Sequence, residues 1–144
     1  MTHAEDIEQI VVAAHALTRI AALETRNEAP AAQWRTLSIL QSEGPRRLGE
    51  LAVMSRVTQP GMTRLVGQLD DAGLISRESD PADSRASVIH ITDAGARALA
   101  AWRVQLRDAL EPHFADLSAD DWAALARTAE ILAVKTAPRV EVAR

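Results

Sequence analysis

The sequence predicts a mainly α-helical protein with one small β-wing, in which long helices flank a central module. Ala and other helix-forming residues dominate a chain of 144 residues that is 47% hydrophobic. Apolar residues recur at three- and four-residue spacing near both ends. Between them, residues 48–92 follow the order short helix, turn, second helix and two short strands joined by a polar loop. That order is typical of a helix-turn-helix followed by a β-hairpin wing.

The N-terminal part predicts a helix over residues 4–25. Its apolar stripe consists of Ile7, Ile10, Ala14, Leu17 and Ala21. Asn27 suits the end of this helix because Asn tolerates a left-handed backbone. Pro30 suits the first turn of a second helix, which we expect to reach Ser42 before the Gly-Pro pair at 44–45 stops it.

The central module predicts a short helix over residues 48–54 and a longer one that ends near Ala72. Thr58 is a good N-cap for the longer helix, and Gly73 is suited to its C-terminal cap. The inward face carries Met62, Leu65, Val66 and Leu69. Strands are predicted over residues 74–78 and 87–91, with the loop 80–84 between them.

Two more helices complete the prediction. Thr92 caps a helix over residues 93–110, and Pro112 ends or kinks it. Ser118 resembles the start of a capping box for a last helix, which reaches about Ala137. That helix repeats the three- and four-residue spacing in Trp122, Leu125, Ala129 and Leu132.

We interpret residues 1–144 as one domain with a winged helix-turn-helix part over 30–92. The flanking segments 4–27 and 93–137 are interpreted as dimerisation helices, because their apolar faces lack an obvious cover within a small winged module. The two ends could pack on each other within one chain. A homodimer is favoured because two-fold symmetry also places two DNA-contacting helices about one DNA turn apart.

Composition narrows the function classes. The chain has no Cys, which excludes disulfides, zinc-thiolate sites and thiol redox switching. No apolar run reaches the ~20 residues of a membrane span, and a signal-peptide pattern is absent, so a cytoplasmic protein is expected. The net charge is −4, yet residues 46–68 hold four Arg and one Glu. Such a local positive surface favours a specific, oriented contact with DNA over general coating.

The outward face of the second module helix carries most candidate DNA-binding residues. They are Thr58, Gln59, Pro60, Gly61, Thr63, Arg64 and Gln68. Gln can bond adenine, Arg can bond guanine, and Thr can bond phosphate or touch a thymine methyl group. The alternative is a solvated face of an amphipathic helix. The preceding turn and the following wing favour DNA.

The wing supplies Asp83 and Arg85 as further candidates. An Arg at a loop tip can enter the minor groove, and Asp83 could hold its guanidinium by bidentate pairing. An ordinary exposed ion pair is the alternative. Directly after a helix of this kind, we favour the DNA role.

Several ordered motifs resemble the MarR family of bacterial transcription regulators. They are Leu48-Gly49-Glu50-Leu51-Ala52, Thr63-Arg64-Leu65-Val66, Leu69, Gly73-Leu74-Ile75, Asp83-x-Arg85 and Ile91-Thr92-x-x-Gly95. The resemblance implies an obligate homodimer, triangular in outline, whose two winged parts bind a pseudo-palindrome in double-stranded DNA. It implies base contacts around Gln59 to Arg64 and a wing role for Asp83 and Arg85. Gly61 departs from a position where a hydroxyl residue is frequent, and Ser84 from one where a second basic residue is common.

Our hypothesis is a homodimeric, ligand-responsive transcription regulator, most simply a repressor that occludes a promoter. The resemblance implies a small aromatic effector, and the missing Cys excludes the thiol-based sensors of this family. His15, Trp34 and Met54 are suggested effector contacts at the seam between dimerisation helices and winged part. The rival is a winged-helix protein-interaction module, and an enzyme is a distant third. No cofactor is expected, and the scattered His residues have no zinc-ligand spacing.

Overall fold

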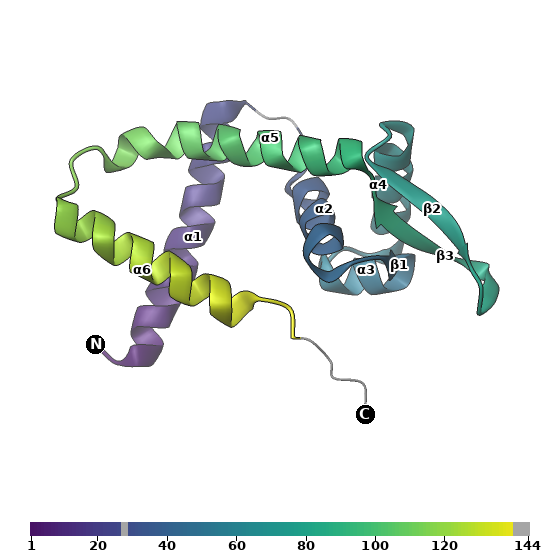
Figure 1. The fold of residues 1–144 in the computed structure, drawn as a ribbon, viewed down its shortest axis with the longest axis horizontal. Coiled ribbons are helices and arrows are strands. Elements are labelled where there is room, and N and C mark those ends of the chain that lie inside the picture. The colour runs from purple at the N-terminus through teal and green to yellow at the C-terminus, as the bar shows by residue number, and fades with distance from the viewer. Residues whose placement is uncertain (27–28, 140–144) are drawn as a thin grey trace. The chain divides into compact units, whose positions relative to one another are not determined.

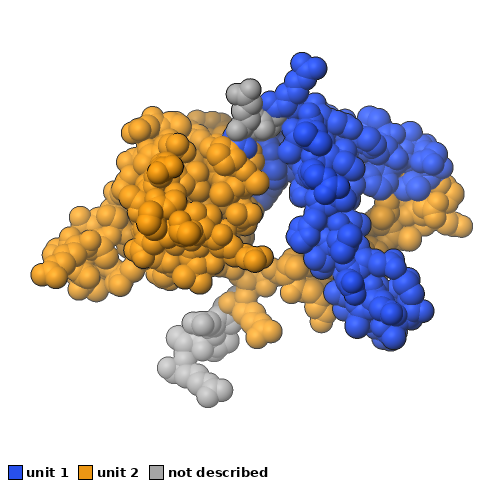
Figure 2. Space-filling model, turned by 180° about the vertical axis from the view of Figure 1, so that it is seen from behind, with its two compact units in different colours: residues 1–29, 100–117 blue, residues 30–99, 118–144 orange. Residues whose placement is uncertain are grey.

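The computed structural model describes residues 1–26 and 29–139 and divides the chain into two compact units. One unit contains residues 1–29 and 100–117, and the other contains residues 30–99 and 118–144 (Figure 2). Figure 1 shows the order of the elements along the chain. The helix α5 (Asp93–Leu110) contributes its first residues to the larger unit and its remainder to the smaller one.

The smaller unit is built on α1 (His3–Thr25), which begins with a capping box between Thr2 and Glu5. Glu5 accepts hydrogen bonds from Thr2, and these hold the pKa of its carboxyl below the usual range. The helix ends at Arg26, which has a left-handed φ of 50°. The sequence had suggested Asn27 for this cap, and Asn27 lies outside the described residues. The 3₁₀ helix η1 (Glu111–Phe114) joins α1 through a 2.6 Å contact between His113 Nε2 and Glu24 Oε1.

The larger unit contains α2 (Ala31–Glu43), α3 (Leu48–Met54), α4 (Gln59–Asp71) and α6 (Ala119–Thr136). The predicted bounds of α3 and α5 match the observed ones. Pro30 is the N-cap of α2 and lies just before its first turn. Ser118 and Asp121 form the predicted capping box of α6.

The larger unit also contains a three-stranded antiparallel sheet with the strand order β1-β3-β2. Its members are β1 (Arg46–Arg47), β2 (Ile75–Asp80) and β3 (Asp83–Ile91). The predicted strands were too short, and β1 was not predicted. Asp80 Oδ1 accepts a 2.9 Å hydrogen bond from the Ala82 backbone N–H, which lets the chain reverse at once and keeps both strands paired. The expected loop 80–84 is therefore only a turn at Pro81 and Ala82.

We call residues 30–92 the winged module, and its core is small and apolar. The side chains of Met62, Leu65, Val66 and Leu69 are buried on one face of α4, as their spacing predicted. They share the core with Leu37, Leu40, Leu51, Ile75, Ile89 and Leu99. Burying each Leu or Ile stabilises the module by roughly 1.5–3 kcal/mol before the entropy of ordering is subtracted. This core fixes the orientation of the outward face of α4.

The wing is sealed to the first turn of α5. The Thr92 hydroxyl donates to the Gly73 carbonyl (2.7 Å) and accepts from the Gly95 backbone N–H (3.0 Å). The Thr92 backbone N–H donates to the Leu74 carbonyl (3.1 Å). A Cβ at position 95 would overlap that same carbonyl oxygen. The close approach explains physically why Gly follows Thr92 at this spacing.

The terminal helices carry several large apolar side chains that are open to solvent, although Ala21 of α1 is buried. In α1, Ile7 is 63% exposed and Leu23 is 73% exposed. In α6, no residue is buried, and Trp122 and Leu125 are each more than 40% exposed. Each of the two helices thus carries apolar surface that its own unit leaves exposed.

Candidate nucleic-acid interface

Hydrogen bonds from α2 fix the turn between α3 and α4. Arg35 Nε donates to the Ser55 carbonyl (2.8 Å), and the hydroxyls of Thr36 and Ser55 lie 3.1 Å apart in the core. Arg56 follows with a left-handed φ of 57°, which reverses the chain. The Val57 backbone N–H then closes the turn on the Ala52 carbonyl (2.9 Å). These contacts set the position of α4 relative to α3.

The N-terminus of α4 is capped as the sequence predicted. The Thr58 hydroxyl accepts a 3.2 Å hydrogen bond from the Gly61 backbone N–H. A Cβ at position 61 would lie 3.0 Å from both this hydroxyl and Val57 Cγ1. Gly61 therefore suits a tight cap, and a larger residue would need the cap to shift. This local packing gives a structural reason for Gly61, which was predicted only as a DNA-binding residue.

The remaining candidates on α4 occupy its exposed face. Gln59, Pro60, Thr63, Arg64 and Gln68 are all exposed, while Gly61 is half-buried. The Thr63 hydroxyl donates to the Gln59 carbonyl (3.0 Å), so it is engaged within the helix. The burial pattern matches the predicted division of α4 into an inner and an outer face.

In the wing, the predicted pairing between the Asp83 carboxylate and the Arg85 guanidinium is replaced by a backbone contact. Both residues belong to β3, and neither lies at a loop tip. Asp83 Oδ1 accepts a 3.0 Å hydrogen bond from the backbone N–H of Arg85, and the expected bidentate pair with the guanidinium is not the contact that forms. The ladder pairs Ser79 with Ser87 but Asp80 with Asp83, so residues 84–86 bulge from it. Such a bulge redirects side chains, and here it carries the exposed Arg85.

A groove of about 470 Å³ connects the start of α4 to the wing. Its lining is Arg47, Leu48, Gly49, Glu50, Gln59, Arg77, Arg85, Ala86 and Ser87. Three Arg and one Glu make this lining positively charged. Gln59 and Arg85, predicted separately from helix and wing, are thus brought to one surface. A groove with this charge is suited to a polyanion.

Sequence reasoning missed two cations of the groove as site residues. Arg77 Nε lies 3.2 Å from Asp70 Oδ2, an ion pair that ties β2 to the end of α4. Arg47 is ion-paired with Asp80. The backbone N–H of Ala82 and the Arg47 guanidinium hold the pKa of the Asp80 carboxyl below its usual range, so it stays charged at neutral pH. Arg47 stood in the charge count of residues 46–68, but pairing with the wing is a tertiary contact.

The suggested effector contacts are spread over both units. His15 is exposed on α1, whereas Trp34 and Met54 are half-buried in α2 and α3. Their joint site remains a prediction. Among the described residues, no group of three or more His, Asp or Glu is placed to hold a metal ion. No helix within the described ranges is long and apolar enough to cross a membrane.

Comparisons with known proteins agree with this geometry. The model of the MarR family matches residues 29–86. A curated HTH-type transcriptional regulator from Mycobacterium leprae is 31% identical over 69% of this chain and 70% of its own length. The chain belongs to the MarR family. Members are transcription regulators with a winged helix-turn-helix fold, and all residues that line the groove except Ser87 lie within the matched part.

Solved structures of transcription regulators share the fold over most of the chain. The transcriptional regulator Tm0710 from Thermotoga maritima superposes with a TM-score of 0.69 at 26% identity, covering 89% of this chain and 92% of its own. Wild-type MarR from E. coli, in its apo form, gives 0.71 at 21% identity over 96% and 98%. The second likeness concerns the fold alone. The predicted fold class and family resemblance are confirmed.

Proposed function

We propose that this MarR-family protein is a homodimeric repressor that binds a pseudo-palindromic operator through α4 and the wing. The observation that carries the proposal is the basic groove, which joins Gln59 of α4 to Arg85 of the wing. In this arrangement α4 enters the major groove, where Gln59 and Arg64 contact bases. Arg85 reaches the adjacent minor groove. Repression follows from occupying a promoter.

The open apolar faces of α1 and α6 support the dimer. Val11 and Val12 of α1, and Ile131 and Leu132 of α6, are between 37% and 61% exposed. Apolar surface of this extent on helices is typical of an association site. A two-fold dimer uses the same patch on both copies and sets the spacing of two winged modules.

Titration on one selected operator tests the DNA-binding residues. We expect Arg64→Ala to lose ~1–3 kcal/mol of binding free energy and to relax base preference at one position. Arg85→Ala should weaken binding mainly to sites with A·T-rich flanks. Asp83→Ala should also weaken binding although it removes a negative charge, because the bulge that carries Arg85 loses its hydrogen bond.

Arg127→Ala is the matched control. It removes the same charge from an exposed site on α6, where Arg127 Nη1 lies 3.3 Å from Glu130 Oε2. Its DNA affinity should stay within about two-fold of wild type, as for a surface residue outside the interface. If Arg64→Ala and Arg85→Ala both bind as tightly as wild type, α4 and the wing do not contact DNA. A protein-interaction module is then the better account, and its binding would depend little on salt.

A small aromatic effector is the second part of the proposal, and it rests on the family. An effector can act only by binding one spacing of the two winged modules more tightly than another. We expect an aromatic carboxylate to lower DNA affinity by ~1–3 kcal/mol. A thermal-shift screen of a phenolic panel, followed by DNA titration, checks this. If no compound changes either property, regulation by protein concentration alone is favoured.

A further inference from the structure

Arg47 occupies the N-cap position of α3, where an Arg side chain cannot act as a cap. Ser, Thr, Asp or Asn is preferred there because a side-chain oxygen accepts an orphan backbone N–H. A guanidinium has no acceptor and cannot do this. Glu50 makes the reverse contact, with its Oε1 accepting the Arg47 backbone N–H at 3.3 Å. The side chain of Arg47 is therefore available for another role.

That side chain is held in the groove by a carboxylate beneath it. Asp80 is only 10% exposed, whereas Arg47 is 47% exposed. One carboxylate oxygen of Asp80 accepts the Ala82 backbone N–H, and the other faces Arg47 Nη2. The guanidinium has five N–H donors, so this pairing leaves donors for an outside ligand. A ligand in the groove can therefore contact the exposed Arg47 guanidinium, whereas the Asp80 carboxylate is almost inaccessible to it.

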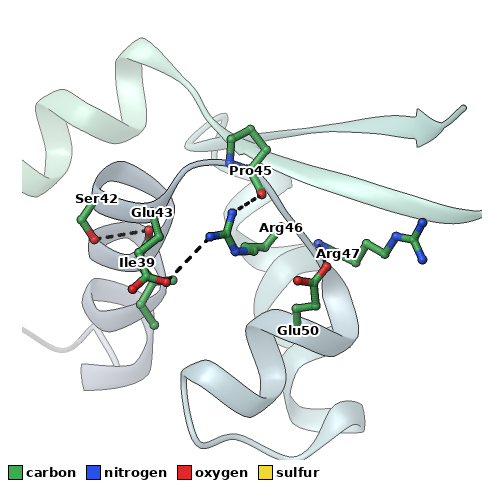
Figure 3. A network of polar contacts seen from close by, with 7 residues as sticks. All are labelled: Ile39, Ser42, Glu43, Pro45, Arg46, Arg47 and Glu50. Carbon is green, nitrogen blue, oxygen red and sulfur yellow. Dashed lines mark hydrogen bonds and ion pairs between the residues drawn. The ribbon is translucent and has the colours of Figure 1, made fainter. Parts of the chain in front are cut away.

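The neighbouring Arg46 provides an internal comparison. Its guanidinium turns toward α2, donating to the Pro45 carbonyl (2.8 Å) and lying 4.0 Å from Glu43, while Arg47 extends away from them (Figure 3). Arg46 does not line the groove. Two adjacent residues of equal charge therefore lie on opposite sides of β1.

We infer that Arg47 binds a DNA phosphate between the contacts of α4 and those of the wing, and that Asp80 is its positioning residue. The inference rests on the proposed DNA binding. Arg47 lies in the same groove as Gln59 and Arg85, so it faces the backbone segment that links the major and minor grooves. A phosphate contact adds affinity for any sequence and contributes about one unit to the salt slope.

The test compares Arg47→Ser with Arg46→Ser by DNA titration from low to high salt. Ser is a good N-cap, so Arg47→Ser keeps a cap on α3. We expect Arg47→Ser to bind operator and random DNA roughly ten-fold more weakly, with a salt slope smaller by about one per protomer. Arg46→Ser should change both quantities little. Unchanged binding by Arg47→Ser, or an equal loss in both variants, would overturn the inference.

A double variant separates the contact from a structural role. Arg47→Ser with Asp80→Ser removes both partners, so no buried carboxylate is left unpaired and the net charge is unchanged. The inference predicts that weak binding and the reduced slope persist in this variant, measured at a temperature where both proteins are folded. Recovery of wild-type affinity would show that Arg47 only balances Asp80. Wild-type protein that binds no DNA would refute the proposed function itself, which is a different outcome.

Discussion

The winged module and the terminal helices share the same kind of apolar spacing but differ in how far the apolar side chains are buried. Met62 and Val66 of α4 have no exposed surface, whereas Ile7 of α1 is 63% exposed and Leu125 of α6 is 42% exposed. All three helices were predicted from three- and four-residue spacing. The spacing therefore indicates where an apolar face lies, but not which chain covers it. In α4 the cover is the module, and for α1 and α6 we assign it to a second copy.

The largest effect is expected where the module is packed most tightly. Gly95→Ala should lower the free energy of unfolding by about 3 kcal/mol, because its Cβ overlaps the Leu74 carbonyl and both backbones must shift. Urea denaturation of the full chain measures this. Gly49→Ala is the control, since nothing lies within 4 Å of its Cβ and Ala favours a helix. Equal stability of the two variants would show that the backbone around Gly95 and Leu74 can shift at little cost in free energy.

The terminal helices should respond through assembly. Leu132→Glu should weaken dimerisation about 100-fold, or roughly 2.7 kcal/mol, because the carboxylate would be desolvated against the partner. Sedimentation velocity across a concentration series measures this change. Val53→Glu on α3 is the matched control, because Val53 is 80% exposed and belongs to the module. If the wild type is a monomer at micromolar concentration, the comparison between regions loses its basis.

A smaller effect concerns the polar contact below the helix-turn-helix turn. Ser55→Ala should cost ~1–2 kcal/mol of stability, because the buried Thr36 hydroxyl loses its partner. Chemical denaturation again measures it. Ser42→Ala should stay within about 0.5 kcal/mol, since Ser42 is exposed. An unchanged stability of Ser55→Ala would mean that the Thr36 hydroxyl finds another hydrogen-bond partner.

The smallest effect is expected at the turn itself. Arg56→Gly should raise stability by about 0.5 kcal/mol, because relief of the left-handed backbone slightly exceeds the added freedom of the unfolded chain. Arg56→Ala removes the same charge but keeps a Cβ, and it should not stabilise. A calorimetric melting temperature that rises equally in both variants would assign the gain to charge.

The outcome of the predictions follows from the range of the interactions. Local signals worked well: Thr58 and Ser118 cap their helices, and the inner face of α4 is buried. The strands were predicted too short, because polar residues such as Ser79 and Asp83 pair through their backbones. The site was predicted as two separate elements. Only the folded chain places Arg47 and Arg77, which are distant in sequence, beside Gln59.

The seal between the wing and α5 has a mechanical consequence. The Thr92 hydroxyl donates to the Gly73 carbonyl, and the Thr92 backbone N–H donates to the Leu74 carbonyl. Gly95 packs so closely against the Leu74 carbonyl that the two backbones cannot shift past each other. The start of α5 and the base of the wing must then tilt as one piece. Because this anchor joins the first turn of α5 to the residues just before β2, a force that tilts this turn would act directly on the base of the wing.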